Sequence, residues 1–329
     1  MQITFLVNDP GDIQPSQTTA MLMAAAVARG HRVGITGVGD LSCRSDCQPW
    51  AQVRFLEVGI SPDLAALMGA IAQNPPTAMP LIQTDLLLLR TNPARDLNHT
   101  AAHSTALALA RHCQSAGVRV INQPDGLIRA ATKLYLLEFP EFTRPETLVS
   151  QTPAEILDFL QDLNGPAVLK PLQGTRGNDV FVVASPQDKN LRQIIDVIRR
   201  QGLVMVQRCI PGAEAGDTRV VVFNGQVLML NGQPAAIQRV PPQGDFRSNL
   251  HAGGRAEPGI VTAAMAKVVA AIGPKLLQDG LFLAGLDFIG SQLVEINVFS
   301  TGGLRNAEQF TGEAFASFII DTWTDGHLP

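Results

Sequence analysis

Short apolar runs alternate with helical patterns of apolar and polar residues over the first third of the chain. Ile3–Val7 and Leu86–Leu89 have the length and composition of buried strands, whereas Thr18–Arg29 follows a helical period. Alternating strands and helices predict a mostly parallel sheet, so we expect an α/β domain at residues 1–122. Its further elements are expected to be strands at Val33–Thr36, Val53–Leu56 and Val118–Asn122, a helix at His99–Ala116, and loops at Asp40–Pro49 and Pro75–Pro76.

Residues 123–329 have a different order of elements, in which hairpins and helices mix as in an α+β fold. Asn224-Gly225 lies between the apolar runs Arg219–Phe223 and Val227–Leu230 and is typical of a two-residue hairpin turn. From about Gly259 to Gln278 the apolar residues fall on one helical face. A lid subdomain is expected at about residues 145–208, with strands Glu146–Val149, Pro166–Pro171, Val180–Val183 and Leu203–Gln207 and helices Pro153–Leu163 and Lys189–Arg200.

Composition excludes several classes of function. With 46% hydrophobic residues the 329-residue chain can build full cores, and its net charge of −4 provides no basic stripe for nucleic acid. No apolar run approaches the roughly 20 residues of a membrane span, and the chain does not begin with a basic and apolar leader. We therefore expect a cytoplasmic protein that acts on small molecules and binds neither nucleic acid nor a membrane.

Cysteine and histidine do not form a convincing catalytic or metal pattern. Cys43 and Cys47 have no second pair nearby, which favours reduced thiols over structural zinc. His99 and His103 share a helix face without the glutamate of a zinc protease motif, so surface or packing roles are favoured.

The stretch Leu286–Asn297 carries the most specific chemistry. With Gly290–Gln292 as a three-residue loop, the expected hairpin pairs Asp287 with Glu295, Phe288 with Val294 and Ile289 with Leu293. Side chains alternate between faces, so Asp287, Glu295 and Asn297 share one face and present oxygen ligands suited to Mg²⁺. The alternative is an amphipathic surface ribbon with solvated acids.

A second pattern supports a nucleotide site. The apolar run that contains Lys170 leads into a loop with Gly174 and Gly177 and then into a second strand. Glycines permit close backbone approach, and free N–H groups cradle anionic oxygens, although two glycines also suit an ordinary turn.

In this order, Lys170, the glycine loop and the acidic hairpin resemble the ATP-grasp superfamily, and the chain is most similar to its prokaryotic glutathione synthetase family. The resemblance implies a Rossmann-like first domain, an ATP-grasp fold at residues 123–329, and an ATP-dependent carboxylate–amine ligase that works through an acyl phosphate. The matching segments are Asn122–Leu127, Thr132–Leu134, Arg144–Val149, Val168–Leu172, Gly216–Val220, Gln238–Pro241, Arg247–Arg255 and Gly285–Asp287.

The resemblance also implies roles for individual residues and, by analogy, a homo-oligomer. Two Mg²⁺ ions, with Mn²⁺ as the alternative, would lie at Asp287, Glu295 and Asn297, and Arg219 and Arg239 would be catalytic. ATP would contact Lys133, Lys170, Gln173, Gly174, Gly177, Gln207 and Ile210, and substrate would contact Asp217, Arg247, Asn249, Ser300, Gly302 and Gly303. Each residue taken singly also has an ordinary structural interpretation. The arginines could form surface ion pairs and Lys133 could be a plain helix residue. Gln207 and Ile210 could belong to the core of a strand, and Asp217 could be a turn residue.

The substrates are less closely specified than the reaction. The family implies addition of glycine to γ-glutamylcysteine, with another acid and amine, or a non-catalytic nucleotide-binding module, as alternatives. Gly302-Gly303 departs from the better-known bacterial members, and these glycines suit either an anion nest for a carboxylate or a simple turn. The loop Val240–Gly254 resembles the family's closing loop. Amide replacement of Glu295 or Asp287 is expected to abolish ligation and leave the fold intact.

Overall fold

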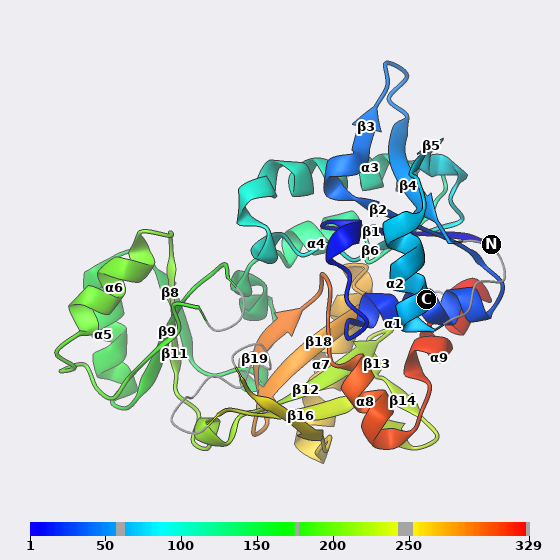
Figure 1. Cartoon of the computed structure of the whole chain (residues 1–329). Coiled ribbons are helices and arrows are strands. Elements are labelled where there is room, and N and C mark those ends of the chain that lie inside the picture. Colours follow the sequence, from blue (N-terminus) through cyan, green and yellow to red (C-terminus); the bar gives the residue numbers. More distant parts are fainter. Residues whose placement is uncertain (57–62, 175–177, 243–252, 327–329) are drawn as a thin grey trace.

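In the computed structural model, which describes residues 1–56, 63–174, 178–242 and 253–326, the first lobe is built on a sheet with four parallel strands. These are β1 (Gln2–Val7), β2 (Arg32–Gly37), β6 (Leu86–Leu89) and β7 (Arg119–Ile121), in the order β2-β1-β6-β7. Alternate residues of the strands pack against α1 (Thr18–Ala28) on one face and α3 (Thr100–Ser115) on the other. The predicted parallel α/β arrangement is confirmed (Figure 1).

The outer part of this sheet differs from the prediction. Residues expected to form a loop contribute β3 (Leu41–Cys43), which pairs with β4 (Pro49–Phe55), and β4 also pairs with β5 (Thr77–Pro80). The turn residues between β3 and β4, with Cys47 at φ 60°, join two strands. Strands this short are specified by their partners across the sheet, and local pattern does not reveal them. Helix α2 (Leu64–Gln73) precedes β5.

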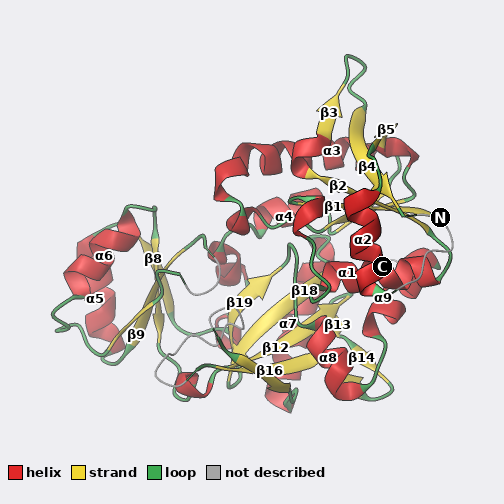
Figure 2. Ribbon diagram, viewed as in Figure 1, coloured by secondary structure: helices red, strands yellow, loops and turns green. Residues whose placement is uncertain are grey.

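A separate antiparallel sheet forms the lobe at the left of Figure 2. Its strands β10 (Phe181–Val183), β9 (Ala167–Pro171), β11 (Val204–Arg208) and β8 (Thr147–Ser150) lie in that order. Helices α5 (Pro153–Leu163) and α6 (Leu191–Arg199) contribute to its own apolar core. All six of these elements were predicted.

The third sheet holds the acidic hairpin. Its order is β17 (Arg255–Pro258), β16 (Ala236–Val240), β12 (Asp217–Phe223), β18 (Leu283–Ile289) and β19 (Gln292–Asn297), and all neighbours are antiparallel. The Asn224-Gly225 turn pairs β12 with β13 (Gln226–Val227), as predicted. The expected strand beyond it is interrupted, because β14 (Met229–Leu230) pairs instead with β15 (Gln233–Pro234).

Helix α7 packs against this sheet and begins later than predicted. It spans Ala263–Gln278 because the Thr262 hydroxyl accepts a hydrogen bond from the Met265 N–H and caps it, while the residues before it form β17. Before the lid lie α4 (Pro124–Arg129) and a 3-10 helix at Lys133–Glu138.

The end of the chain returns to the first lobe. After α8 (Leu304–Thr311), helix α9 (Phe315–Thr324) packs on α1, and Arg29, which directly follows α1, pairs with Asp321 of α9. Trp323 is fully buried in the core that α1 shares. The domain boundaries at residue 122 and at about residues 145 and 208 stay predictions. Within the described ranges, the helices are too short or too polar to cross a membrane.

Candidate functional site

The β18–β19 hairpin places the predicted acidic residues together. Asp287 lies opposite Glu295 and Gly285 opposite Asn297, so the three polar side chains share a face, as predicted. The register nearer the turn was predicted wrongly. Phe288 pairs with Leu293 and Ile289 with Gln292, because the turn has two residues and β19 bulges.

The bulge residue Val294 provides the contact with Lys170. Lys170 Nζ donates a hydrogen bond to the Val294 carbonyl at 3.3 Å, and Lys133 Nζ donates to the Gly174 carbonyl at 3.1 Å. Burial and, to a smaller extent, the nearby charge of Lys133 lower the pKa of Lys170 to about 8, although the charges of Glu295 and Asp287 act to raise it. The fold therefore joins Lys170 to the acidic hairpin and Lys133 to the backbone at Gly174.

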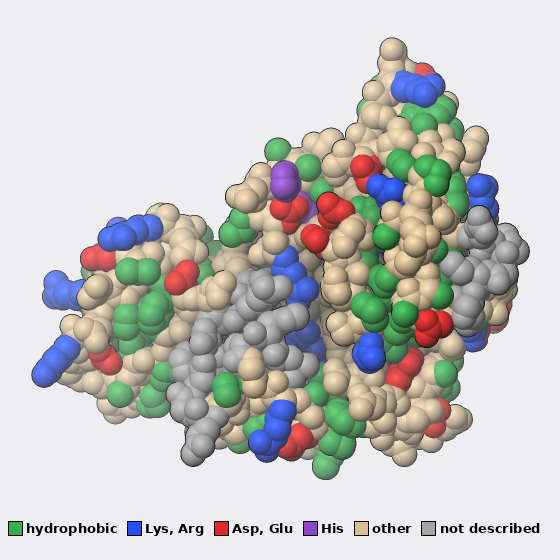
Figure 3. Space-filling model, in the orientation of Figure 1, with side chains coloured by type: hydrophobic (Ala, Val, Ile, Leu, Met, Phe, Trp, Pro, Cys, Tyr) green, Lys and Arg blue, Asp and Glu red, His purple; other side chains and the backbone are tan. Residues whose placement is uncertain are grey.

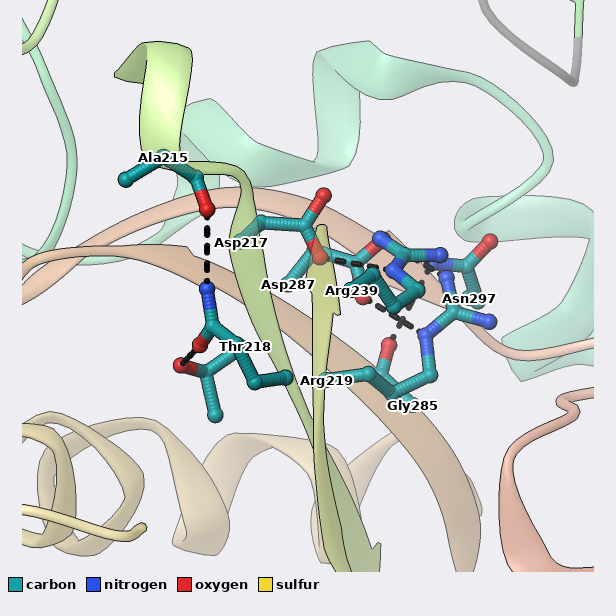
Figure 4. A network of polar contacts seen from close by, with 9 residues as sticks. Ala215, Asp217, Thr218, Arg219, Arg239, Gly285, Asp287 and Asn297 are labelled. Atoms are coloured by element: carbon teal, nitrogen blue, oxygen red, sulfur yellow. Dashed lines mark hydrogen bonds and ion pairs between the residues drawn. The ribbon is translucent and has the colours of Figure 1, made fainter. Parts of the chain in front are cut away.

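Asp287 is the centre of a buried ionic network (Figure 4). The carboxylate accepts two hydrogen bonds of 2.6 Å from Arg219 and lies 2.7 Å from Nη2 of Arg239. Only 1% of Asp287 is exposed. Burial alone would raise the pKa of Asp287, but the two guanidinium charges outweigh it and hold that pKa well below its usual range.

Sheet register explains these pairs. Arg219 lies opposite Asp287 across β12–β18, and Asp217 lies opposite Arg239 across β12–β16. Arg239 Nε donates to Asp217 Oδ1 at 2.6 Å. Burial opposes the charged form of Arg239, yet the charges of Asp287 and Asp217 raise its pKa. Asp217 thus holds a catalytic candidate in place, and its direct contact with substrate stays a prediction.

The donor set suits Mg²⁺. Asp287, Glu295 and Asn297 offer carboxylate and amide oxygens, the ligands this ion prefers. Asn297 Nδ2 donates to Asp287 Oδ2 at 3.2 Å, and both Asp287 oxygens accept from arginine. A cation at Asp287 would therefore share this carboxylate with the two guanidinium groups. Across the described part of the chain, histidine, cysteine and carboxylate side chains form no metal cluster of three or more.

Positive charge is prominent around this site. Figure 3 shows Lys and Arg side chains along a hollow at the centre of the molecule, between the lid lobe and the first lobe. Four cationic candidates, at positions 133, 170, 219 and 239, accompany the three carboxylates at positions 217, 287 and 295. This balance suits a polyanion that arrives with a divalent cation.

The remaining nucleotide candidates occupy varied positions. Gln207 on β11 is 3% exposed and donates to Thr147 Oγ1 at 3.0 Å, whereas Gln173 is exposed and Ile210 is half-buried. Gly177, Arg247 and Asn249 lie outside the described residues. The predicted loop Val240–Gly254 contains Arg247 and Asn249. Its first residue, Val240, pairs with Arg255, which directly follows the loop.

Sequence reasoning missed Arg90, which reaches the loop that contains Ser300, Gly302 and Gly303. Arg90 directly follows β6, and its Nη2 donates to the Thr301 carbonyl at 3.0 Å. An arginine at the carboxyl end of an apolar parallel strand was a usable signal, because ligands bind at that edge.

The two histidine and two cysteine candidates of the first lobe lie in other settings. His103 is 2% exposed, and its Nε2 lies 3.0 Å from Asp96 Oδ2. His99 is exposed and also contacts Asp96. Cys43 and Cys47 are exposed free thiols.

Comparisons with known proteins agree with this geometry. The family models for the prokaryotic glutathione synthetase N-terminal domain and ATP-grasp domain match residues 1–128 and 132–312. Glutathione synthetase of Synechococcus elongatus is 34% identical over 97% of each chain, and that of Brucella melitensis is 33% identical over 96% of this chain and 94% of its own. The solved ATP-grasp ligase PsnB, in complex with a minimal precursor, covers 98% of both chains with a TM-score of 0.64 and 18% identity, which supports the fold.

Proposed function

The chain belongs to the prokaryotic glutathione synthetase family of ATP-grasp ligases, and we propose that it joins γ-glutamylcysteine to glycine with conversion of ATP to ADP and phosphate. The observation that carries the proposal is the meeting of Lys170 with the acidic hairpin through the Val294 carbonyl. It supports the proposal because the Lys170 ammonium, a candidate phosphate-binding group, lies against the hairpin that carries the candidate Mg²⁺ ligands.

The reaction requires activation, because a carboxylate does not condense with an amine in water. A carboxylate oxygen of γ-glutamylcysteine attacks the γ-phosphorus of ATP, and ADP leaves. The amine of glycine then attacks the carbonyl carbon of the acyl phosphate, phosphate leaves, and the amine loses a proton. Phosphoryl transfer of this kind depends chiefly on positioning and charge neutralisation.

The metal candidates fit one part of that task. Asp287, Glu295 and Asn297 would hold Mg²⁺, and we propose two ions, with Mn²⁺ as the alternative. When bound, the ions neutralise the β- and γ-phosphate oxygens. Arg219 and Arg239 would contact the acyl phosphate and the tetrahedral intermediate, where preorganised positive charge is most effective.

The other predicted roles complete the proposal. Lys133 and Lys170 neutralise the nucleotide phosphates, and burial of Lys170 strengthens its interaction with them. We retain phosphate contacts for Gln173, Gly174 and Gly177, adenine contacts for Gln207 and Ile210, and substrate contacts for Asp217, Arg247, Asn249, Ser300, Gly302 and Gly303. A cytoplasmic location and a homo-oligomer are also retained as predictions.

A product assay tests the function. Purified protein is incubated with ATP, Mg²⁺, γ-glutamylcysteine and glycine, and ADP and tripeptide are measured together. Equal amounts of both are expected, with neither formed by Glu295→Gln. A panel of other acids and amines tests the related-ligase alternative. ATP binding without turnover of any pair would support the nucleotide-binding module instead.

A further inference from the structure

The 3-10 helix Lys133–Glu138, which we call the junction helix, contacts both the acidic hairpin and the lid. It packs against β19 of the hairpin. At its first residue, the Lys133 N–H donates a hydrogen bond to the Leu172 carbonyl at 3.0 Å, and Lys133 Nζ donates to the Gly174 carbonyl at 3.1 Å. Both carbonyls follow β9 directly. The position of this short helix therefore decides where Lys133 lies relative to the metal candidates.

A cluster of charged and polar side chains fastens the junction helix to α7. The Tyr135 hydroxyl donates a hydrogen bond to Asp279 Oδ2 at 2.7 Å. Lys275 Nζ lies 2.9 Å from Asp279 Oδ2 and 2.8 Å from Glu138 Oε2, and Arg129 of α4 lies 2.6 Å from Glu138. Tyr135 is 2% exposed, and 7% of the Asp279 side chain is exposed. Two carboxylates face two cations here, so the cluster is complete without a ligand.

The faces of the junction helix have different surroundings. A 3-10 helix has three residues per turn, so residues three apart share a face. Tyr135 and Glu138 are such a pair, and both belong to the cluster, whereas Lys133 lies on another face. The half-buried Lys133 ammonium has three N–H donors, and the Gly174 contact uses one of them. The helix is thus fastened through one face while Lys133 keeps donors for an anion.

The protonation states make the contact between Tyr135 and Asp279 a strong one. Burial, together with the hydrogen bond to Asp279, raises the pKa of Tyr135 far above its usual range, so the hydroxyl keeps its proton. Burial alone would raise the pKa of Asp279, but the hydrogen bonds from Tyr135 and Lys275 outweigh it and lower that pKa. A hydroxyl that donates to a carboxylate forms a charge-assisted hydrogen bond, about twice as strong as a neutral one.

The turn after α7 links this cluster to the metal candidates. Asp279 is the C-cap residue of α7, and the next strand, β18, carries Asp287. The backbone fixes the same turn, because the Gln123 N–H donates a hydrogen bond to the Gly280 carbonyl at 2.9 Å. One turn therefore holds the junction helix through Tyr135 and leads directly into the strand of Asp287.

We propose that Tyr135 and Asp279 are positioning residues that hold Lys133 in place for the nucleotide phosphates. This inference rests on the proposed function, which assigns Lys133 to those phosphates. A preorganised ammonium binds a phosphate without first losing conformational freedom, so a loosened junction helix should bind ATP more weakly. The proposed function places the acid and amine substrates elsewhere, so their KM values should not depend on this helix.

Tyr135→Phe removes the hydroxyl and keeps the buried ring. Calorimetry measures binding of the non-hydrolysable β,γ-imido analogue of ATP, with Mg²⁺, to wild type, Tyr135→Phe, Lys133→Met and the double variant. We expect Tyr135→Phe to weaken binding roughly 5- to 20-fold and to have little further effect in Lys133→Met, because its contribution passes through that lysine. Arg111→Ala is the matched control, because it breaks an exposed ion pair with Asp125 of α4 and should leave binding unchanged.

Steady-state kinetics and thermal unfolding separate positioning from a purely structural role. In Tyr135→Phe the KM for ATP should rise roughly 5- to 20-fold, while kcat and the KM values of the other two substrates stay within about 2-fold of wild type. A purely structural role would lower the unfolding midpoint without this selective change.

Two results would overturn the positioning role, namely unchanged nucleotide binding in Tyr135→Phe and an equal loss of binding with and without Lys133. If Tyr135→Phe does not fold, Glu138→Gln replaces it in the same comparison, because it weakens the cluster from its more exposed side. A wild type that shows the coupling but forms no product from γ-glutamylcysteine and glycine would remove the proposed function and leave the positioning role in place.

Discussion

Replacement of Asp287 by asparagine is expected to damage both the reaction and the fold. Sequence reasoning treats this residue as part of a metal site that the fold does not need. In the structure, Asp287 is 1% exposed and holds two guanidinium groups. An amide of the same shape has one acceptor oxygen, and its NH₂ group faces a cation without bonding to it.

The size of the effect follows from the bonds lost. Asp287 accepts two hydrogen bonds from Arg219 and pairs with Arg239, all at 2.6–2.7 Å. Hydrogen bonds to charged groups contribute about 1.5–3 kcal/mol each, and removal of one partner of a buried ion pair costs about 3–5 kcal/mol. We expect Asp287→Asn to lower the free energy of unfolding by about 3–5 kcal/mol, a large part of the roughly 5–15 kcal/mol of a typical domain.

Urea unfolding in EDTA, followed by circular dichroism, measures this free energy without any contribution from bound metal. Glu295→Gln is the matched control, because Glu295 is only half-buried and is expected to change stability by less than about 1 kcal/mol. Both variants should lack ligase activity. An unfolding midpoint for Asp287→Asn equal to that of wild type would refute the role of Asp287 in the fold.

Three further predictions concern other parts of the chain. Burial lowers the pKa of Lys170 to about 8, and bound phosphates favour the charged form of this lysine. ATP binding should therefore take up a proton at about pH 9 and little at about pH 7. Calorimetry in buffers of different ionisation enthalpy measures the proton uptake, and an equal uptake at the two pH values would contradict the lysine–phosphate contact. Gly126→Ala places a Cβ 1.9 Å from the Asp279 carbonyl oxygen and should lower the free energy of unfolding by about 2 kcal/mol or more. Gly69→Ala, in the middle of α2 where a Cβ meets no other atom, should raise the free energy of unfolding by about 0.5–1 kcal/mol, and urea unfolding measures both changes. Thr262→Ala removes the cap of α7 and should cost about 1 kcal/mol by the same measurement, and an unchanged midpoint would argue against the cap.

Local pattern was sufficient for much of the fold and for part of the site. The pairing of Asp287 with Glu295 follows from the alternation of strand residues and is present in the structure. The sequence does not reveal the bulge at Val294, because Leu293 and Val294 are both apolar and either could lie opposite Phe288. That bulge matters, since its carbonyl contacts Lys170.

The ionic network depends on neighbours far apart in sequence. Arg219 meets Asp287 across a separation of 68 residues, and Arg239 meets Asp217 across 22. The sequence predicted that these arginine and aspartate residues belong to one site, but only the order of the strands in the sheet shows which of them pair. Arg90 belongs to no motif, and its partners at Phe299 and Thr301 lie more than 200 residues away.

The docking of α9 on α1 has a consequence for folding during synthesis, because these two helices lie far apart in the sequence. The apolar core on the α1 face of the first sheet includes Phe315, Ile319 and Trp323, which are synthesised long after α1. The first lobe therefore cannot complete its core as its own residues emerge, because one wall arrives about 200 residues later. Until then α1 presents uncovered apolar surface, so chaperone protection of the nascent chain would matter most before α9 is synthesised.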